Sequence, residues 1–148
     1  MNKREWMANS AVLALAAVAG KASAQAAAPH AHHHMAGPGP NAALMAAAAD
    51  CTGKSQICLS HCLDLLAGGE KDMLGCGKAV NETIAICVAL QALAAQDAKG
   101  LKTFAKLAEA TCLACEKECR KHETKHKECK DCADSCVECA KQCKAISA

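Results

Sequence analysis

The chain has 148 residues, a formal net charge of +2, thirteen cysteines and only two aromatic residues. Removal of a predicted leader, residues 1–24, takes away three basic residues and one acidic residue, which leaves fourteen of each. A neutral chain gives no electrostatic case for binding nucleic acid or an anionic membrane, and its length suits one domain.

Residues 1–24 are predicted to be a signal peptide. A basic start precedes an apolar run from Ala11 to Gly20, and Ala22-Ser23-Ala24 supplies a small-x-small cleavage pattern. The stretch NKREWM at residues 2–7 resembles the twin-arginine export signal with Lys3 in place of the first arginine, and ordinary secretion remains open. No later apolar segment is expected to be long enough to span a membrane. We therefore expect a soluble protein exported to the periplasm.

Residues 25–40 have no apolar period and are expected to form a flexible tail bearing histidine and methionine. Residues 41–148 are predicted to form an all-α, antiparallel up-down four-helix bundle. Asn41 can cap a first helix that Gly68-Gly69 stops. Further helices are expected over about 71–95, about 100–121 and about 125–146, because no segment alternates with period two and the composition favours helix.

The cysteines follow the inward-facing seams of these helices. In the fourth helix they are separated by three, four, three and four residues, which is the spacing of a face that packs on a bundle core. Leu, Ile, Val and Phe make up only 19 of the 124 residues after the leader, so sulfur must line the core. The candidate ligands are Cys51, Cys58, Cys62, Cys76, Cys87, Cys112, Cys115, Cys119, Cys129, Cys132, Cys136, Cys139 and Cys143.

Such a core has several possible uses. One or two cysteines can be plain small hydrophobes, but thirteen are too many for that interpretation. Disulfides suit an exported chain. Helix neighbours at i+3 and i+4 hold their Cβ atoms about 5 to 6 Å apart, however, whereas a disulfide needs about 3.5 to 4.5 Å. Bridges within one helix would be strained, while bridges between helices stay open.

Metal binding is the other use. Cys-x-x-Cys pairs, such as 112 with 115, suggest zinc or an iron–sulfur cluster, but their intervening residues favour helix rather than the usual turns and loops. Zinc on four thiolates also leaves two negative charges to bury. Copper(I) is soft and seeks thiolates, and one ion per thiolate makes the core neutral. The sequence therefore favours storage of Cu(I), roughly one ion per cysteine.

Several motifs resemble those of the four-helix-bundle copper storage proteins. They are CLSHC at 58–62, MLGC at 73–76, CLACEKEC at 112–119 and CKDCADSCVECAKQC at 129–143. The leader followed by HAHHHM resembles the exported branch of that family in methane-oxidising bacteria. The resemblance implies a homotetramer of bundles that holds many Cu(I) ions. It also implies a copper-enzyme client such as particulate methane monooxygenase.

Ligands other than cysteine are expected at one end of the bundle. His61 and Met73 can reach the end of the cysteine column and pass Cu(I) inward without adding negative charge. Their alternative roles are a helix-end cap and a core plug. The opposite end is expected to be closed by Leu44, Leu90, Leu93, Leu101 and Phe104.

The other histidines lie in the last loop, where His122 is expected at the mouth, and in the tail. His122 and His126 lie in the last loop and are expected to be solvated. The histidines of the tail are either solvated or gather copper weakly. No pattern of residues supports catalysis, and a thiol redox enzyme would need an exposed, low-pKa cysteine at a helix start.

Overall fold

A computed structural model describes residues 39–148. The predicted signal peptide and nearly all of the predicted tail lie outside these residues. The described part contains α1 (Ala42–Ala67), the short 3-10 helix η1 (Lys71–Met73), α2 (Leu74–Ala95), α3 (Leu101–Arg120) and α4 (Lys127–Ser147). The predicted all-α four-helix fold is confirmed.

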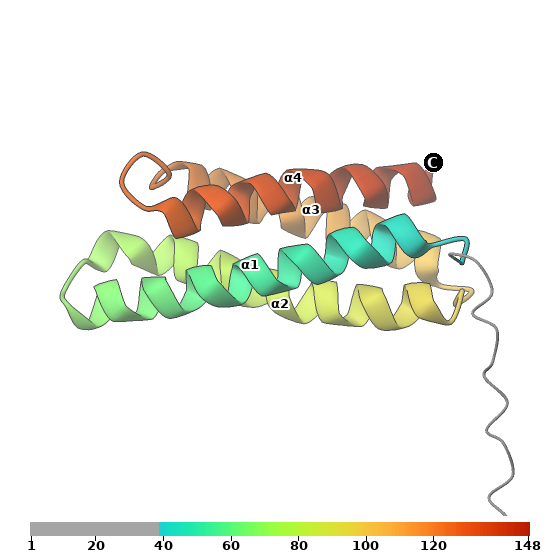
Figure 1. Cartoon of the computed structure of the whole chain (residues 1–148), viewed down its shortest axis with the longest axis horizontal. Coiled ribbons are helices and arrows are strands. Elements are labelled where there is room, and N and C mark those ends of the chain that lie inside the picture. Colours follow the sequence, from blue (N-terminus) through green and yellow to red (C-terminus); the bar gives the residue numbers. More distant parts are fainter. Residues whose placement is uncertain (1–38) are drawn as a thin grey trace, which may run out of the picture. The chain divides into compact units, whose positions relative to one another are not determined.

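The four long helices run alternately in opposite directions (Figure 1). Helix α1 packs on α2 and α4, and α3 packs on the same two helices, so α1 and α3 lie diagonally opposite each other. The α1–α2 and α3–α4 connections lie at one end of the bundle, which we call the mouth (Figure 1). The start of α1, the α2–α3 connection and the C-terminus lie at the other end, which we call the far end.

The turn after α1 forms as the glycine pair predicts. Gly69 has a φ of 98°, a backbone conformation that glycine adopts without a Cβ clash. The N–H of Gly69 donates to the carbonyl of Leu66, and the N–H of Glu70 donates to that of Leu65. These bonds satisfy the last carbonyls of α1 and turn the chain into η1 at the mouth.

The start of α1 differs from the prediction. Asn41 precedes the helix, but its side chain makes no capping hydrogen bond. Its amide nitrogen instead donates to the carbonyl of Ala94 and to the carboxylate of Asp97, at 3.1 Å each. Asn41 therefore ties the start of α1 to the end of α2 rather than capping its own helix.

The far end of the core is covered by the expected apolar side chains, which are buried to different degrees. Leu44, Leu90 and Leu101 are buried. Leu93 and Phe104 are only partly buried and pack against the core from its edge. They therefore cover the core from the side, while the next residue along each helix, Ala94 or Ala105, is the buried one.

The segment Lys71–Ala95 is long and apolar enough to cross a membrane by length and composition alone. The expectation that no segment after the leader would meet this test was therefore wrong. In the structure, the α2 part of this segment packs against α1 and α3. Its inward seam includes Cys76, Val80 and Cys87, all of which are fully buried.

Candidate metal centre

All thirteen cysteine side chains lie in the core with 0% of their surface exposed. Helix α1 contributes three, α2 two, α3 three and α4 five. Each is a free thiol, so residues 39–148 contain no disulfide. All of them lie in the core because the predicted spacing of three and four residues returns every sulfur on a helix to the same, inward face.

Sulfur atoms from different helices contact one another along the core. Close pairs between helices include Cys76 with Cys119 at 3.5 Å, Cys51 with Cys136 at 3.7 Å and Cys58 with Cys129 at 3.9 Å. Because these contacts join α1 to α4 and α2 to α3, the thiols form one column that runs lengthwise through the bundle.

Within this column, sets of thiols are close enough to share metal ions. The sulfur atoms of each set lie within 4.8 Å of one another. The mouth group consists of Cys58, Cys62, Cys76 and Cys129. The deep group consists of Cys51, Cys87, Cys112 and Cys139. Two three-thiol sets are Cys58 with Cys119 and Cys132, and Cys115 with Cys132 and Cys136.

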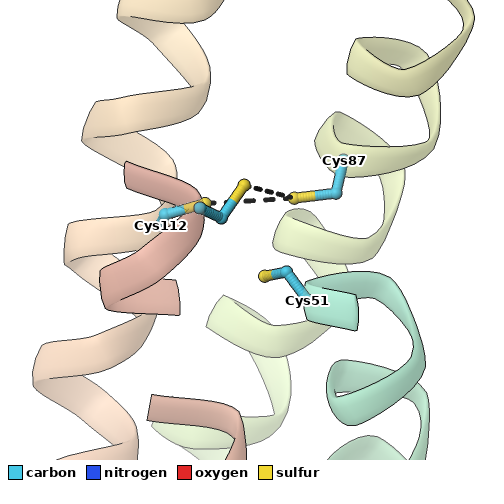
Figure 2. A group of neighbouring side chains, drawn as sticks. Cys51, Cys87 and Cys112 are labelled. Atoms are coloured by element: carbon cyan, nitrogen blue, oxygen red, sulfur yellow. Dashed lines mark hydrogen bonds between the residues drawn. The ribbon is translucent and has the colours of Figure 1, made fainter. Parts of the chain in front are cut away.

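The deep group shows how separate helices build one site. Cys51 of α1, Cys87 of α2 and Cys112 of α3 extend into the same space between the helices (Figure 2). The sulfur of Cys87 lies 3.9 Å from that of Cys112 and 3.9 Å from that of Cys139 on α4. Ligands therefore approach a shared position from all four sides of the bundle.

Among the residues that the structure describes, the core holds no charged side chain that could balance thiolates. Within residues 39–148, the buried polar residues are Asn41, Thr52, Ser55, Thr83, Thr111 and Ser135. Any thiol that loses its proton must therefore find its positive partner in a bound ion, because an uncompensated buried charge is costly. One Cu(I) per thiolate meets this condition, whereas one Zn²⁺ per four thiolates leaves two negative charges.

Neighbouring thiols shift one another's pKa values in opposite directions. In the deep group, hydrogen bonding with Cys112 is the main cause that lowers the pKa of Cys51. Hydrogen bonding with the same residue, together with burial, raises the pKa of Cys87 above its ordinary value of 9.0. In the mouth group, hydrogen bonds between thiols likewise lower the pKa of Cys76 and raise that of Cys58. A metal ion would therefore meet thiols with raised and with lowered pKa values in each group.

The structure places His61 and Met73 at the mouth. Met73 is fully buried beside the thiols, while 25% of the His61 side chain is exposed. The Nε2 atom of His61 lies 2.9 Å from Nδ1 of His126 and 3.7 Å from a carboxylate oxygen of Glu128. A thioether and an imidazole thus lie at the mouth, in contrast to the apolar side chains at the far end.

His126 is a mouth residue that the sequence did not reveal. It was expected to be solvated, but it is half-buried and its ring contacts that of His61 on the neighbouring helix α1. The backbone explains its position, because the N–H of His126 donates to the carbonyl of His122 at 3.0 Å and so closes the α3–α4 turn. Its partner is 65 residues away, so no local pattern could have indicated the pair.

Comparisons with known proteins agree with this geometry. A family model described as copper storage protein (Csp) matches residues 39–148. The uncharacterised cysteine-rich protein YhjQ of Bacillus subtilis strain 168 is 30% identical over 106 residues, which cover 72% of this chain and 94% of the relative.

Solved structures extend the comparison. Apo copper storage protein 3 of Bacillus subtilis is 31% identical, with a TM-score of 0.63 over 72% of this chain and 97% of that one. Cu(I)-bound copper storage protein BsCsp3 is 30% identical, with a TM-score of 0.63 over 72% and 96%. The copper storage protein Ccsp of Streptomyces lividans, loaded with 10 copper equivalents, shares the fold at 21% identity, with a TM-score of 0.65 over 78% and 92%.

Proposed function

Because this chain belongs to the copper storage protein family, we propose that its core stores Cu(I) at about one ion per cysteine. The observation that carries this capacity is the column of thirteen fully buried thiols without a buried cation among residues 39–148. Neutrality then requires about one Cu⁺ for each thiolate. Two-coordinate copper with bridging sulfur gives the same ratio, since each ion has two sulfurs and each sulfur two ions.

A titration of the fully reduced protein with Cu(I) against a competing chelator tests this capacity. We expect saturation near thirteen ions, the number of cysteines. Saturation at three or four ions would instead indicate discrete zinc-like or cluster sites. Counting thiols with and without reductant separates storage from a disulfide-stapled protein, because disulfides would remove titratable thiols from the unreduced sample.

We propose that the protein stores copper and does not act as an enzyme. The thiols lie along helix interiors and are fully buried, whereas a thiol redox enzyme needs a reactive, accessible cysteine. The cargo is copper, kept for supply to copper enzymes and for detoxification. By the family resemblance, a client such as particulate methane monooxygenase fits this role, and the test is transfer of copper from the loaded protein to the metal-free client.

We also propose export to the periplasm through the leader at residues 1–24, by the twin-arginine route or by ordinary secretion. The basic start, apolar run and cleavage pattern support this assignment. Fractionation of cells that express the full chain, with amino-terminal sequencing of the mature form, tests it. Cleavage after residue 24 and recovery from the periplasm are the expected results.

A homotetramer is proposed from the family resemblance and from an apolar surface on α1 and α2. A groove there is lined mainly by Leu59, Leu63, Leu66 and Leu74. Leu63 is 56% exposed and Leu74 is 49% exposed, which is unusual for neighbouring leucines on a single chain. Burial of this leucine surface against another copy would remove it from water.

A further inference from the structure

We propose that the mouth group and the deep group are separate copper compartments, and that Cys132, held by Ser55, is the thiol through which Cu(I) passes between them. This inference rests on the proposed storage function. It adds that the stored copper is divided between two groups of thiols. It also assigns a positioning role to Ser55, which is not among the proposed copper ligands.

The first observation is a gap in the thiol column on two helices. Between Cys51 and Cys58, the seam of α1 carries Ser55, and between Cys76 and Cys87 the seam of α2 carries only Val80 and Thr83. These three replacement side chains are all fully buried. At this level, which we call the waist, thiols come only from α3 and α4.

The second observation is the overlap of the thiol sets at the waist. Cys132 is the only residue shared by the two three-thiol sets. One of these sets also contains Cys58 of the mouth group. The other contains Cys136, whose sulfur lies 3.7 Å from that of Cys51 in the deep group. A copper ion that exchanges ligands stepwise can therefore move between the groups over Cys132.

The third observation is the contact that holds Cys132. The hydroxyl oxygen of Ser55 lies 3.5 Å from the Cys132 sulfur, which allows a hydrogen bond to a sulfur atom. When copper binds and the thiol becomes a thiolate, the hydroxyl donates to the sulfur. This bond orients Cys132 and draws electron density from it, so copper at the waist is held less firmly than copper at a four-thiol group.

Among residues 39–148, apolar side chains cover the deep group at the far end. Leu44 and Leu90 lie beyond it, and both are at most 1% exposed. A second path crosses the waist, because the sulfur of Cys115 lies 3.9 Å from that of Cys119. Loss of Cys132 should therefore slow exchange with the deep group rather than abolish it.

The test compares two single substitutions of fully buried cysteines, Cys132→Ser at the waist and Cys143→Ser at the deep end of α4. Both variants are loaded with Cu(I), and a chelator then removes the copper in a stopped-flow experiment. We expect Cys132→Ser to release part of its copper in a phase about tenfold slower than wild type, a barrier increase near 1.4 kcal/mol. Cys143→Ser should lose about as much capacity and keep the wild-type rate. Equal release kinetics in the two variants would overturn the proposal.

A second variant, Ser55→Cys, keeps the test independent of any loss of stability in Cys132→Ser. It adds a thiol at the waist, so the capacity should rise by about one ion and release from the deep group should become faster. Slower or unchanged release would contradict the role assigned to the waist. The equilibrium capacity of the wild-type protein tests storage itself. If the wild type binds the expected amount of Cu(I) but the variants release copper at the wild-type rate, only the two-compartment proposal is overturned.

Discussion

The imidazole rings of His61 and His126 meet at the mouth, with their Nε2 and Nδ1 atoms 2.9 Å apart. A hydrogen bond between two ring nitrogens needs one donor and one acceptor, so at least one ring is neutral. The contact joins α1 to the start of α4, and Met73 is buried at the same end. A neutral imidazole and a thioether are suitable transient ligands for Cu(I).

Removal of these mouth ligands should slow copper movement without emptying the store. Met73→Ala would leave a cavity and cost about 2–5 kcal/mol, so the sharper variant is His61→Ala combined with the volume-conserving Met73→Leu. We expect slower loading and slower chelator-driven removal in stopped-flow measurements, with most of the capacity intact. The control is His122→Ala, which changes a histidine of the same turn. Unchanged rates in the double variant would show that copper enters by another route.

The metal-free, reduced protein should already be folded. Neutral thiols pack as small hydrophobes, and no buried side-chain nitrogen or oxygen among residues 39–148 lacks a hydrogen-bond partner. Circular dichroism of the reduced protein should therefore show a helical spectrum and a cooperative thermal transition. Bound copper should add stability, by about 2.7 kcal/mol per site at a free concentration one hundred times Kd. A random-coil spectrum that becomes helical only with copper would contradict this expectation.

Copper binding should release protons, and apparent affinity should rise with pH. Hydrogen bonding with Cys112 and burial raise the pKa of Cys87 above 9.0, and thiol hydrogen bonds and burial raise that of Cys136 as well. Such thiols are protonated at neutral pH, so each must lose a proton to bind. A pH-stat titration should record this release. Affinity that is independent of pH between 6 and 8 would contradict it.

The same pKa shifts predict that alkaline pH destabilises the metal-free protein more than the copper-loaded protein. A thiol with a raised pKa favours the folded state below its unfolded pKa, near 9.0, and loses that contribution as the pH rises further. The reduced, metal-free protein should therefore melt at lower temperature at pH 10 than at pH 8. The copper-loaded protein should change less, because its thiolates are already coordinated. Equal losses in the two forms would assign the effect to other groups.

Self-association should depend on the leucine surface of α1 and α2. Leu63→Glu places a charge in the proposed interface and should shift the protein from tetramer towards smaller species in size-exclusion chromatography with light scattering. Leu107→Glu on α3 is the matched control, because Leu107 is 50% exposed and does not line the groove. A similar shift in both variants would show that the groove is not specific.

Much of the fold could be predicted because its determinants are local. A repeat of three and four residues fixes which side of a helix carries sulfur, and the same repeat in four helices places the sulfurs together. The glycine pair after α1 likewise acts through its own backbone conformation. These features need no knowledge of a distant partner, which is why the helices and the buried cysteine seams agree with the sequence pattern.

The features that could not be predicted depend on contacts between distant residues. Asn41 bonds to residues 53 and 56 positions away instead of capping α1. His126 meets His61 only because the α3–α4 turn brings it over the mouth. Leu93 and Phe104 looked like core residues because they are large and apolar. The positions that face inward on their helices are instead those of Ala94 and Ala105.

The inward seam gives one side chain two tasks, since each cysteine is both a packing unit and a ligand. A helix rises about 1.5 Å per residue, so one more seven-residue repeat on each of four helices would lengthen the bundle by roughly 10 Å and add about eight inward positions. The cross-section and the mouth would stay the same. In this architecture the number of inward cysteine positions therefore depends on the length of the bundle. That length can change by whole repeats while the mouth remains unchanged.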